Sequence, residues 1–128
     1  MFETLRIRLW GSVPCAKINN KTLERIINRE FGNGATEVKQ KLQKITNNGR
    51  ENKNRISAAI VKLANKDIAA IDNFVEISNS DYRDVLSPAE YPRFNELGFV
   101  GIKGMAKNKK KEIIISDWKH YSKWLNRK

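Results

Sequence analysis

The chain has one cysteine, Cys15, and one histidine, His120, among its 128 residues. A single cysteine excludes an internal disulfide framework and any zinc site built from several cysteines. One histidine likewise removes the metal sites and general-base arrangements that depend on clustered imidazoles. We therefore predict no cofactor, no bound metal and no catalytic residue. We interpret His120 as structural and Cys15 as a buried, inert thiol, with a reactive thiol as the alternative.

Long apolar runs are also missing. Arg6 and Arg8 precede the stretch LWGSVPCA, which resembles the start of a signal peptide, but this stretch is short and is interrupted by Ser12 and Pro14. No segment approaches the roughly 18 apolar residues that cross a membrane as a helix. The sequence therefore predicts a cytoplasmic protein with no membrane partner.

Basic residues are plentiful, and the formal net charge is +11. Part of this charge reflects composition, because Lys, Asn and Ile together supply 44 of the 128 residues, a bias that AT-rich codons also produce. The distribution is more informative than the total. Residues 1–66 hold 14 bases and 5 acids, residues 67–100 hold 2 bases and 7 acids, and residues 101–128 hold 9 bases and 2 acids. The chain is thus basic at both ends with an acidic segment between them.

Apolar spacing predicts a mainly α fold, a single helical domain over residues 1–128 with five or six helices around one core. The most regular unit is residues 55–78, where two apolar stripes are separated by a break at 65–67. Asp67 is a suitable N-cap for the second helix, so the pattern indicates a central helical hairpin. Residues 1–20 are expected to form an extended arm or a strand, since LRIRL at 5–9 alternates apolar and basic side chains.

Two further helices are predicted on either side of the Gly-Asn-Gly sequence at 32–34. The first is amphipathic through Phe31, and the second points Ala35, Val38, Leu42 and Ile45 inward. Glycine at 32 supplies the left-handed conformation that ends helices. Gly-x-Gly before a helix is also half of a phosphate-binding loop, but neither a third glycine nor a Gly-Lys-Ser/Thr sequence follows. We therefore interpret it as a plain turn between helices.

The C-terminal segment is expected to be a glycine-containing loop at 98–111 that leads through the basic residues 107–111 into a last helix. In that helix, Ile114, Trp118, Tyr121 and Leu125 share one face and are predicted to lie in the core. Trp124 falls outside this stripe. Trp118 is therefore predicted to be buried and Trp124 to be the freer of the two indoles.

The sequence DYRDVLSPAEYPRF at 81–94 concentrates acids, aromatics and two prolines. Asp81 is expected to cap a short helix, and Ser87-Pro88-Ala89-Glu90 matches a capping box that would start another. Pro92 then limits the second helix, which predicts two brief helical turns that meet at a bend. Tyr82, Tyr91 and Phe94 would pack there. Arg83 and Arg93 would pair with the neighbouring acids and keep them ionised.

Three functions follow from these patterns, in descending order of preference. The first is a small, non-enzymatic interaction module for a protein partner, the second is a nucleic-acid-binding protein, and the third is an enzyme that uses the acids of 81–94. The residues assigned to partner binding are Asp81, Tyr82, Arg83, Asp84, Glu90, Tyr91 and Arg93. Those assigned to nucleic-acid binding, where bases stand beside an aromatic side chain, are Lys107, Lys109, Lys110, Lys111, Lys119, Lys123, Trp124 and Arg127.

Overall fold

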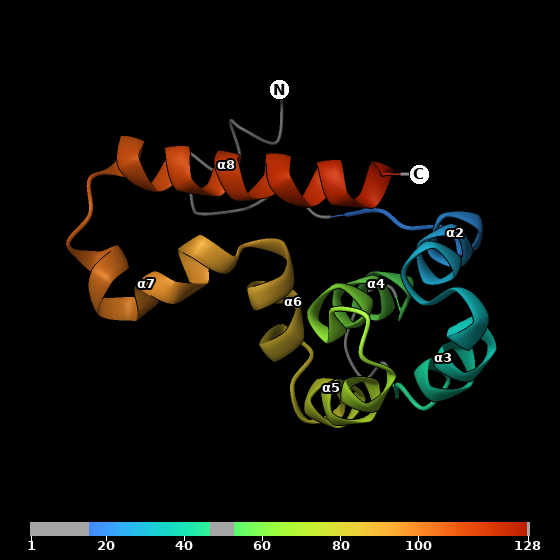
Figure 1. Ribbon diagram of the computed structural model, residues 1–128. Helices are drawn as coiled ribbons and strands as arrows, with labels where there is room; N and C mark the ends of the chain where they lie inside the picture. The colour runs from blue at the N-terminus through green and yellow to red at the C-terminus, as the bar shows by residue number, and fades with distance from the viewer. Residues whose placement is uncertain (1–15, 47–52, 128) are drawn as a thin grey trace. The chain divides into compact units, whose positions relative to one another are not determined.

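The computed structural model of the protein describes residues 16–46 and 53–127. The predicted strand at 5–9 and Cys15 lie outside these residues. The predicted mainly α class is confirmed, because every regular element in the described ranges is a helix (Figure 1). None of these helices is long and apolar enough to cross a membrane. The elements are α2 (Asn20–Phe31), the 3-10 helix η1 (Gly32–Gly34), α3 (Ala35–Leu42), α4 (Lys53–Ala64), α5 (Ile68–Ser80), α6 (Arg83–Glu90), α7 (Pro92–Lys103) and α8 (Lys107–Asn126).

The chain divides into two compact units, which we call the N-terminal unit (Lys17–Ala89) and the C-terminal unit, whose described residues are Glu90–Arg127 and Ala16. In the N-terminal unit, α4 packs against both α2 and α5, and α3 also packs against both α2 and α5. The four helices therefore surround a common core (Figure 1). This core is built from fully buried aliphatic side chains of all four helices, including Ile26, Val38, Ile56, Ile60 and Ile71.

The helical hairpin predicted at 55–78 is confirmed as α4 and α5. Ala58 and Ala59 are completely buried, and their small side chains let neighbouring helices approach closely. The turn uses Asn65 and Lys66 at positive φ, 49° and 69°. Asn tolerates this left-handed conformation, whereas it costs Lys about 1 kcal/mol. The predicted cap is also present, because Asp67 Oδ1 accepts a hydrogen bond of 3.0 Å from the backbone N–H of Ala69.

Gly32 ends α2 as predicted. Its φ of 50° and ψ of −115° lie in a region that is essentially restricted to glycine. The backbone N–H of Gly32 donates to the carbonyl of Asn28, which satisfies one of the last carbonyls of the helix. The inward face predicted for the following helix is confirmed, because Ala35, Val38, Leu42 and Ile45 are all buried.

The capping box predicted at 87–90 is wrong. Ser87 to Glu90 form the last turn of α6, with Pro88 inside the helix. The start of α6 is instead marked by Asp81, whose Oδ1 accepts a hydrogen bond from the backbone N–H of Arg83. Pro88 has no N–H to donate to the carbonyl of Asp84, four residues earlier. Asp84 lies in the first turn of this short helix, so only one hydrogen bond near the start of the helix is lost.

The loop predicted from residue 98 is also wrong, because α7 continues to Lys103 and only residues 104–106 connect it to α8. Pro92 occupies the first position of α7, where its fixed φ and missing N–H are tolerated. The basic segment 107–111 forms the first residues of α8 itself. The two helices run antiparallel and pack together as the main elements of the C-terminal unit (Figure 1).

The prediction for the last helix is confirmed in part. Ile114 and Tyr121 of the predicted stripe are buried, and Trp118 is partly buried against the cluster formed by Tyr91 and Ile114. The prediction that Trp124 is the freer indole is wrong, because Trp124 is 8% exposed and stacks on Tyr121, with 5.7 Å between ring centroids. The buried face also includes Ile113 and Asp117, so it is rotated from the predicted stripe toward Trp124.

Candidate functional site

The first residues of the predicted partner surface form a local structure at the start of α6. Arg83 donates to Asp81 through Nε to Oδ1 at 3.0 Å and through Nη2 to Oδ2 at 2.9 Å. These hydrogen bonds, together with the backbone N–H of Arg83, lower the pKa of Asp81 below its ordinary value. The predicted pairing of Arg83 with a neighbouring acid is therefore confirmed. Asp81 acts here as an ionised hydrogen-bond acceptor.

The later residues of the same stretch do not form an exposed strip. Glu90 is 1% exposed, and Tyr91 is buried against Ile114 with Phe94 packed beside it. A partner could not reach Glu90 or Tyr91 without displacing that packing. The prediction that Arg93 pairs with a neighbouring acid is also wrong, since its Nη1 donates to Ser116 Oγ at 3.3 Å. Of the predicted partner-binding residues, Arg83, Asp84 and Arg93 are exposed, and Asp81 and Tyr82 are half-buried.

An acid that the sequence patterns did not single out joins the two helices of the C-terminal unit. Asp117 on α8 is 1% exposed, and its Oδ2 accepts a hydrogen bond of 2.9 Å from the backbone N–H of Phe94. Phe94 lies in the first turn of α7, where backbone N–H groups have no partner within the helix. Asp117 therefore caps α7 from the neighbouring helix. Its burial makes this role structural.

The basic residues of α8 fall into two groups. Lys107, Lys110 and Lys111 fall within about 100° of one another on the first turns, and Lys110 and Lys111 are half-buried. At 100° per residue, Lys119 and Lys123 project from the side of α8 opposite the buried face, and Lys109 projects from the flank of the helix next to them. All three are exposed, and we call this set the basic face.

Few acids compete for the basic face. Lys109 lies 3.7 Å from Glu112, a spacing typical of a weak surface ion pair. Lys119 and Lys123 form no ion pair with any acid in the described ranges. Arg127 is exposed next to the end of the helix, while His120 is exposed and its Nδ1 lies 2.9 Å from the carbonyl of Ser116. Glu112 projects in the same direction as Lys119 and Lys123, so the positive charge of the basic face is carried mainly by Lys119 and Lys123 in the second half of α8.

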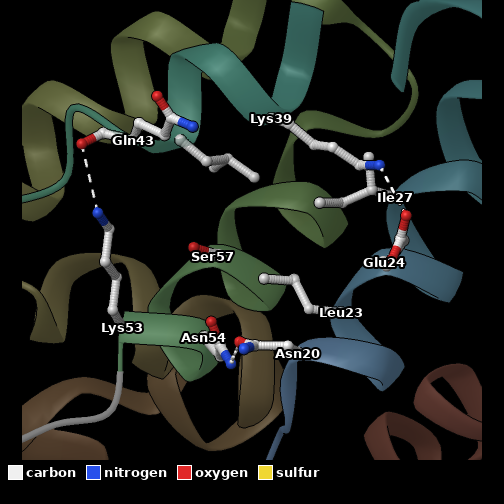
Figure 2. A pocket seen from close by; sticks show the side chains of 10 residues that line it. Asn20, Leu23, Glu24, Ile27, Lys39, Gln43, Lys53, Asn54 and Ser57 are labelled. Carbon is white, nitrogen blue, oxygen red and sulfur yellow. Dashed lines mark hydrogen bonds and ion pairs between the residues drawn. The ribbon is translucent and has the colours of Figure 1, made fainter. Parts of the chain in front are cut away.

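A pocket in the N-terminal unit was not predicted from the sequence. It lies between α2, α3 and α4 and has a volume of about 500 Å³ (Figure 2). Leu23, Ile27 and Leu42 give it an apolar floor, and Ile27 and Leu42 are buried. The volume is within the range of small-molecule sites.

Polar interactions between helices border this pocket. Lys39 on α3 forms an ion pair of 3.1 Å with Glu24 on α2. Lys53 at the start of α4 donates to the backbone carbonyl of Gln43 at 3.3 Å, on the side of the pocket away from the Lys39–Glu24 pair (Figure 2). Asn54 donates to Asn20 Oδ1 at 2.7 Å. Each of the three helices is thus tied to the other two around the pocket.

Ser57 on α4 contributes a hydroxyl to the middle of the pocket lining (Figure 2). The residue is 2% exposed, and its Oγ makes no hydrogen bond to any residue that the structure describes. Ser57 Oγ is not one of the fully buried polar atoms that lack a partner, so the hydroxyl is open to the pocket. The Ser57 hydroxyl is therefore a polar group for which the pocket has space but the protein supplies no partner.

The pocket could not be inferred from the sequence because it depends on how three helices meet. One signal was present: Ser57 is a polar residue between Ile56 and Ala58 on a helix that is otherwise buried on almost every side. A polar residue among buried apolar neighbours is the informative exception to a hydrophobic pattern.

Comparisons of the chain with models of known protein families, with curated proteins and with solved structures found no match. Function is therefore argued from the geometry and chemistry of the residues described above.

Proposed function

We propose that this chain is a non-enzymatic nucleic-acid-binding protein that contacts the phosphate backbone through the basic face of α8. The observation that carries the proposal is the exposure of Lys109, Lys119 and Lys123 on one side of a single 20-residue helix. Lysines that are not neutralised by neighbouring acids are the residues that gain most from a phosphate partner, because binding releases the counterions condensed on the nucleic acid.

The spacing of the basic face suits a polyanion better than a single small anion. Lys109 and Lys123 are 14 residues apart, which corresponds to about 21 Å along the helix axis. Duplex DNA carries about one charge per 1.7 Å of its axis, so several phosphates lie within that length. Lys119 and Lys123 are one turn apart and can contact neighbouring phosphates.

The burial of Trp124 affects the mode of binding. The sequence suggested that this indole stacks on bases, but Trp124 is stacked on Tyr121 inside the C-terminal unit. Without an exposed aromatic side chain on the basic face, base stacking has no platform there. We therefore expect contacts to phosphates that position the nucleic acid without reading its sequence.

The test is binding of the full chain to fluorescent single- and double-stranded oligonucleotides of mixed sequence, measured by anisotropy between about 50 and 200 mM salt. The test variant changes Lys109, Lys119 and Lys123 to Glu. The matched control changes Lys17, Lys21 and Lys44, three exposed lysines of the N-terminal unit, to Glu. Both variants carry the same net charge, so a difference between them reports the position of the lysines.

We expect the wild-type chain to bind both oligonucleotides, with an affinity that falls steeply as salt rises. Loss of three phosphate contacts should reduce the log–log salt slope by about 2–3 for the duplex, and only in the α8 variant. Equal weakening in both variants would rule out the basic face as the specific contact. No binding at the lowest salt would overturn the proposal and attribute the net charge to composition.

A further inference from the structure

The polar-rimmed pocket between α2, α3 and α4 has a chemistry of its own, independent of the basic face of α8. We propose that it binds a small amphiphilic carboxylate. The hydrocarbon part would cover Leu23, Ile27 and Leu42, and the carboxylate would accept hydrogen bonds from Lys53 and Ser57. The observation that carries the proposal is that the Ser57 hydroxyl, which lines the pocket, has no hydrogen-bond partner among the described residues.

The polar end of the pocket favours an acceptor with negative charge. Lys53 carries three donor protons, and its single described hydrogen bond is a long one, 3.3 Å, to the carbonyl of Gln43. The Ser57 hydroxyl can donate a further proton. A carboxylate accepts several hydrogen bonds at once and matches these donors in number and charge.

The rest of the pocket favours an apolar body of limited size. Three aliphatic side chains supply the floor, and the volume of about 500 Å³ accommodates a small ligand. Glu24, the one carboxylate among the described lining residues, is paired with Lys39 on the side away from Lys53 (Figure 2). That pair limits repulsion between Glu24 and a bound carboxylate. The pocket therefore has a donor-rich end and an apolar floor, which match the polar and apolar ends of an amphiphile.

The experiment titrates the full ¹⁵N- and methyl-labelled chain with octanoate and follows the NMR signals of the pocket residues. 1-Octanol is the ligand control, because it keeps the alkyl chain and lacks the charge. The protein variants are Lys53→Met, which removes the ammonium group, and Ser57→Ala, which removes the hydroxyl. Lys44→Met is the control variant. It removes an exposed ammonium group from the same unit without changing the pocket lining.

We expect saturable binding of octanoate with a Kd of about 1 mM or below, and with shifts centred on Leu23, Ile27 and Leu42. Lys53→Met and Ser57→Ala should each weaken binding about tenfold, because each removes a donor to a charged group. Octanol should bind more weakly than octanoate, and Lys44→Met should bind like the wild type.

Three results would overturn the proposal: no saturable shift of the pocket signals, equal binding of octanol and octanoate, or equal weakening by Lys44→Met and Lys53→Met. The first would leave the pocket as a packing gap, the second would remove the role of the donors, and the third would reduce Lys53 to a general attraction of charge. Ser57→Ala keeps the backbone and removes one atom, so it remains a valid test if Lys53→Met disturbs the start of α4.

Discussion

At the scale of the residue, the carboxyl group of Asp117 on α8 links α8 to α7 through one backbone N–H group. It accepts the N–H of Phe94, which has no acceptor within α7 because it lies in the first turn. We expect Asp117→Ala to lower the free energy of unfolding by about 2 kcal/mol, since a hydrogen bond to a charged group is lost and the amide is left buried. Urea denaturation followed by tryptophan fluorescence measures this change.

Asp117→Asn is the matched control, because the side-chain amide keeps an oxygen at the same position. It should lose less stability than Asp117→Ala. Glu112→Ala on the exposed side of the same helix should have little effect, since its described ion pair is a long contact between exposed side chains. Equal losses for Asp117→Ala and Glu112→Ala would contradict the capping role.

The same residue explains why the sequence misassigned the two tryptophans of α8. A stripe that is defined by apolar residues alone includes Trp118 and omits Asp117, because acidic residues are usually exposed. The structure buries Asp117 with Ile113 and Trp124 on one side of the helix, so the buried face is rotated toward Trp124. The apolar pattern was sufficient to predict the helix. The direction of its buried face depended on a polar residue that satisfies a neighbouring helix.

At the scale of the element, the ion pair between Lys41 on α3 and Asp72 on α5 links two helices of the N-terminal unit at 2.6 Å. Their mutual hydrogen bond lowers the pKa of Asp72 and raises the pKa of Lys41 relative to their ordinary values. The contribution of Asp72 is therefore present above its unfolded pKa and is lost as pH falls through its lower folded value. The contribution of Lys41 is present below its unfolded pKa and is lost as pH rises through its higher folded value.

We expect Asp72→Asn to lower the urea midpoint between about pH 4 and pH 10, the window set by the unfolded pKa values of Asp and Lys. The difference from the wild type should shrink outside this window and should also shrink as salt is added, because the side chain of Asp72 is exposed. Glu76→Gln, an exposed acid on the same helix, is the control. A difference that stays constant down to pH 2 would show that the pair does not contribute through charge.

Elements were predictable from the sequence where local signals agreed with packing, as at Gly32 and Asp67. They were not predictable where two local signals competed. Ser87-Pro88-Ala89-Glu90 has the residues of a capping box, but Val85 and Leu86 are buried in the turn before it, and burying them keeps the helix continuous through Pro88. Likewise, the glycines after residue 97 did not end α7, because packing against α8 stabilises helix beyond the preference of its residues.

At the scale of the whole molecule, the two units differ in how many of the described helices each one contains. The N-terminal unit holds α2 to α5 around one centre, whereas the described helices of the C-terminal unit are α7 and α8. Domains below about 40 residues rarely fold without a disulfide, a metal or a partner. The pocket belongs to the larger unit and the basic face to the smaller one. Binding in the pocket should therefore be retained by a fragment of the N-terminal unit alone.

We expect a fragment of residues 17–89 to unfold cooperatively in urea and to bind octanoate, because its helices and its pocket are contained within one core. A fragment of residues 90–128 should show little helix by circular dichroism, since a chain of about 40 residues rarely buries enough surface to offset the entropy of ordering it. Nucleic-acid binding should then be strong only in the full chain, where α8 is folded and its lysines are held on one face. A folded, tightly binding 90–128 fragment would contradict this account, because it would show that the basic face needs no support from the rest of the chain.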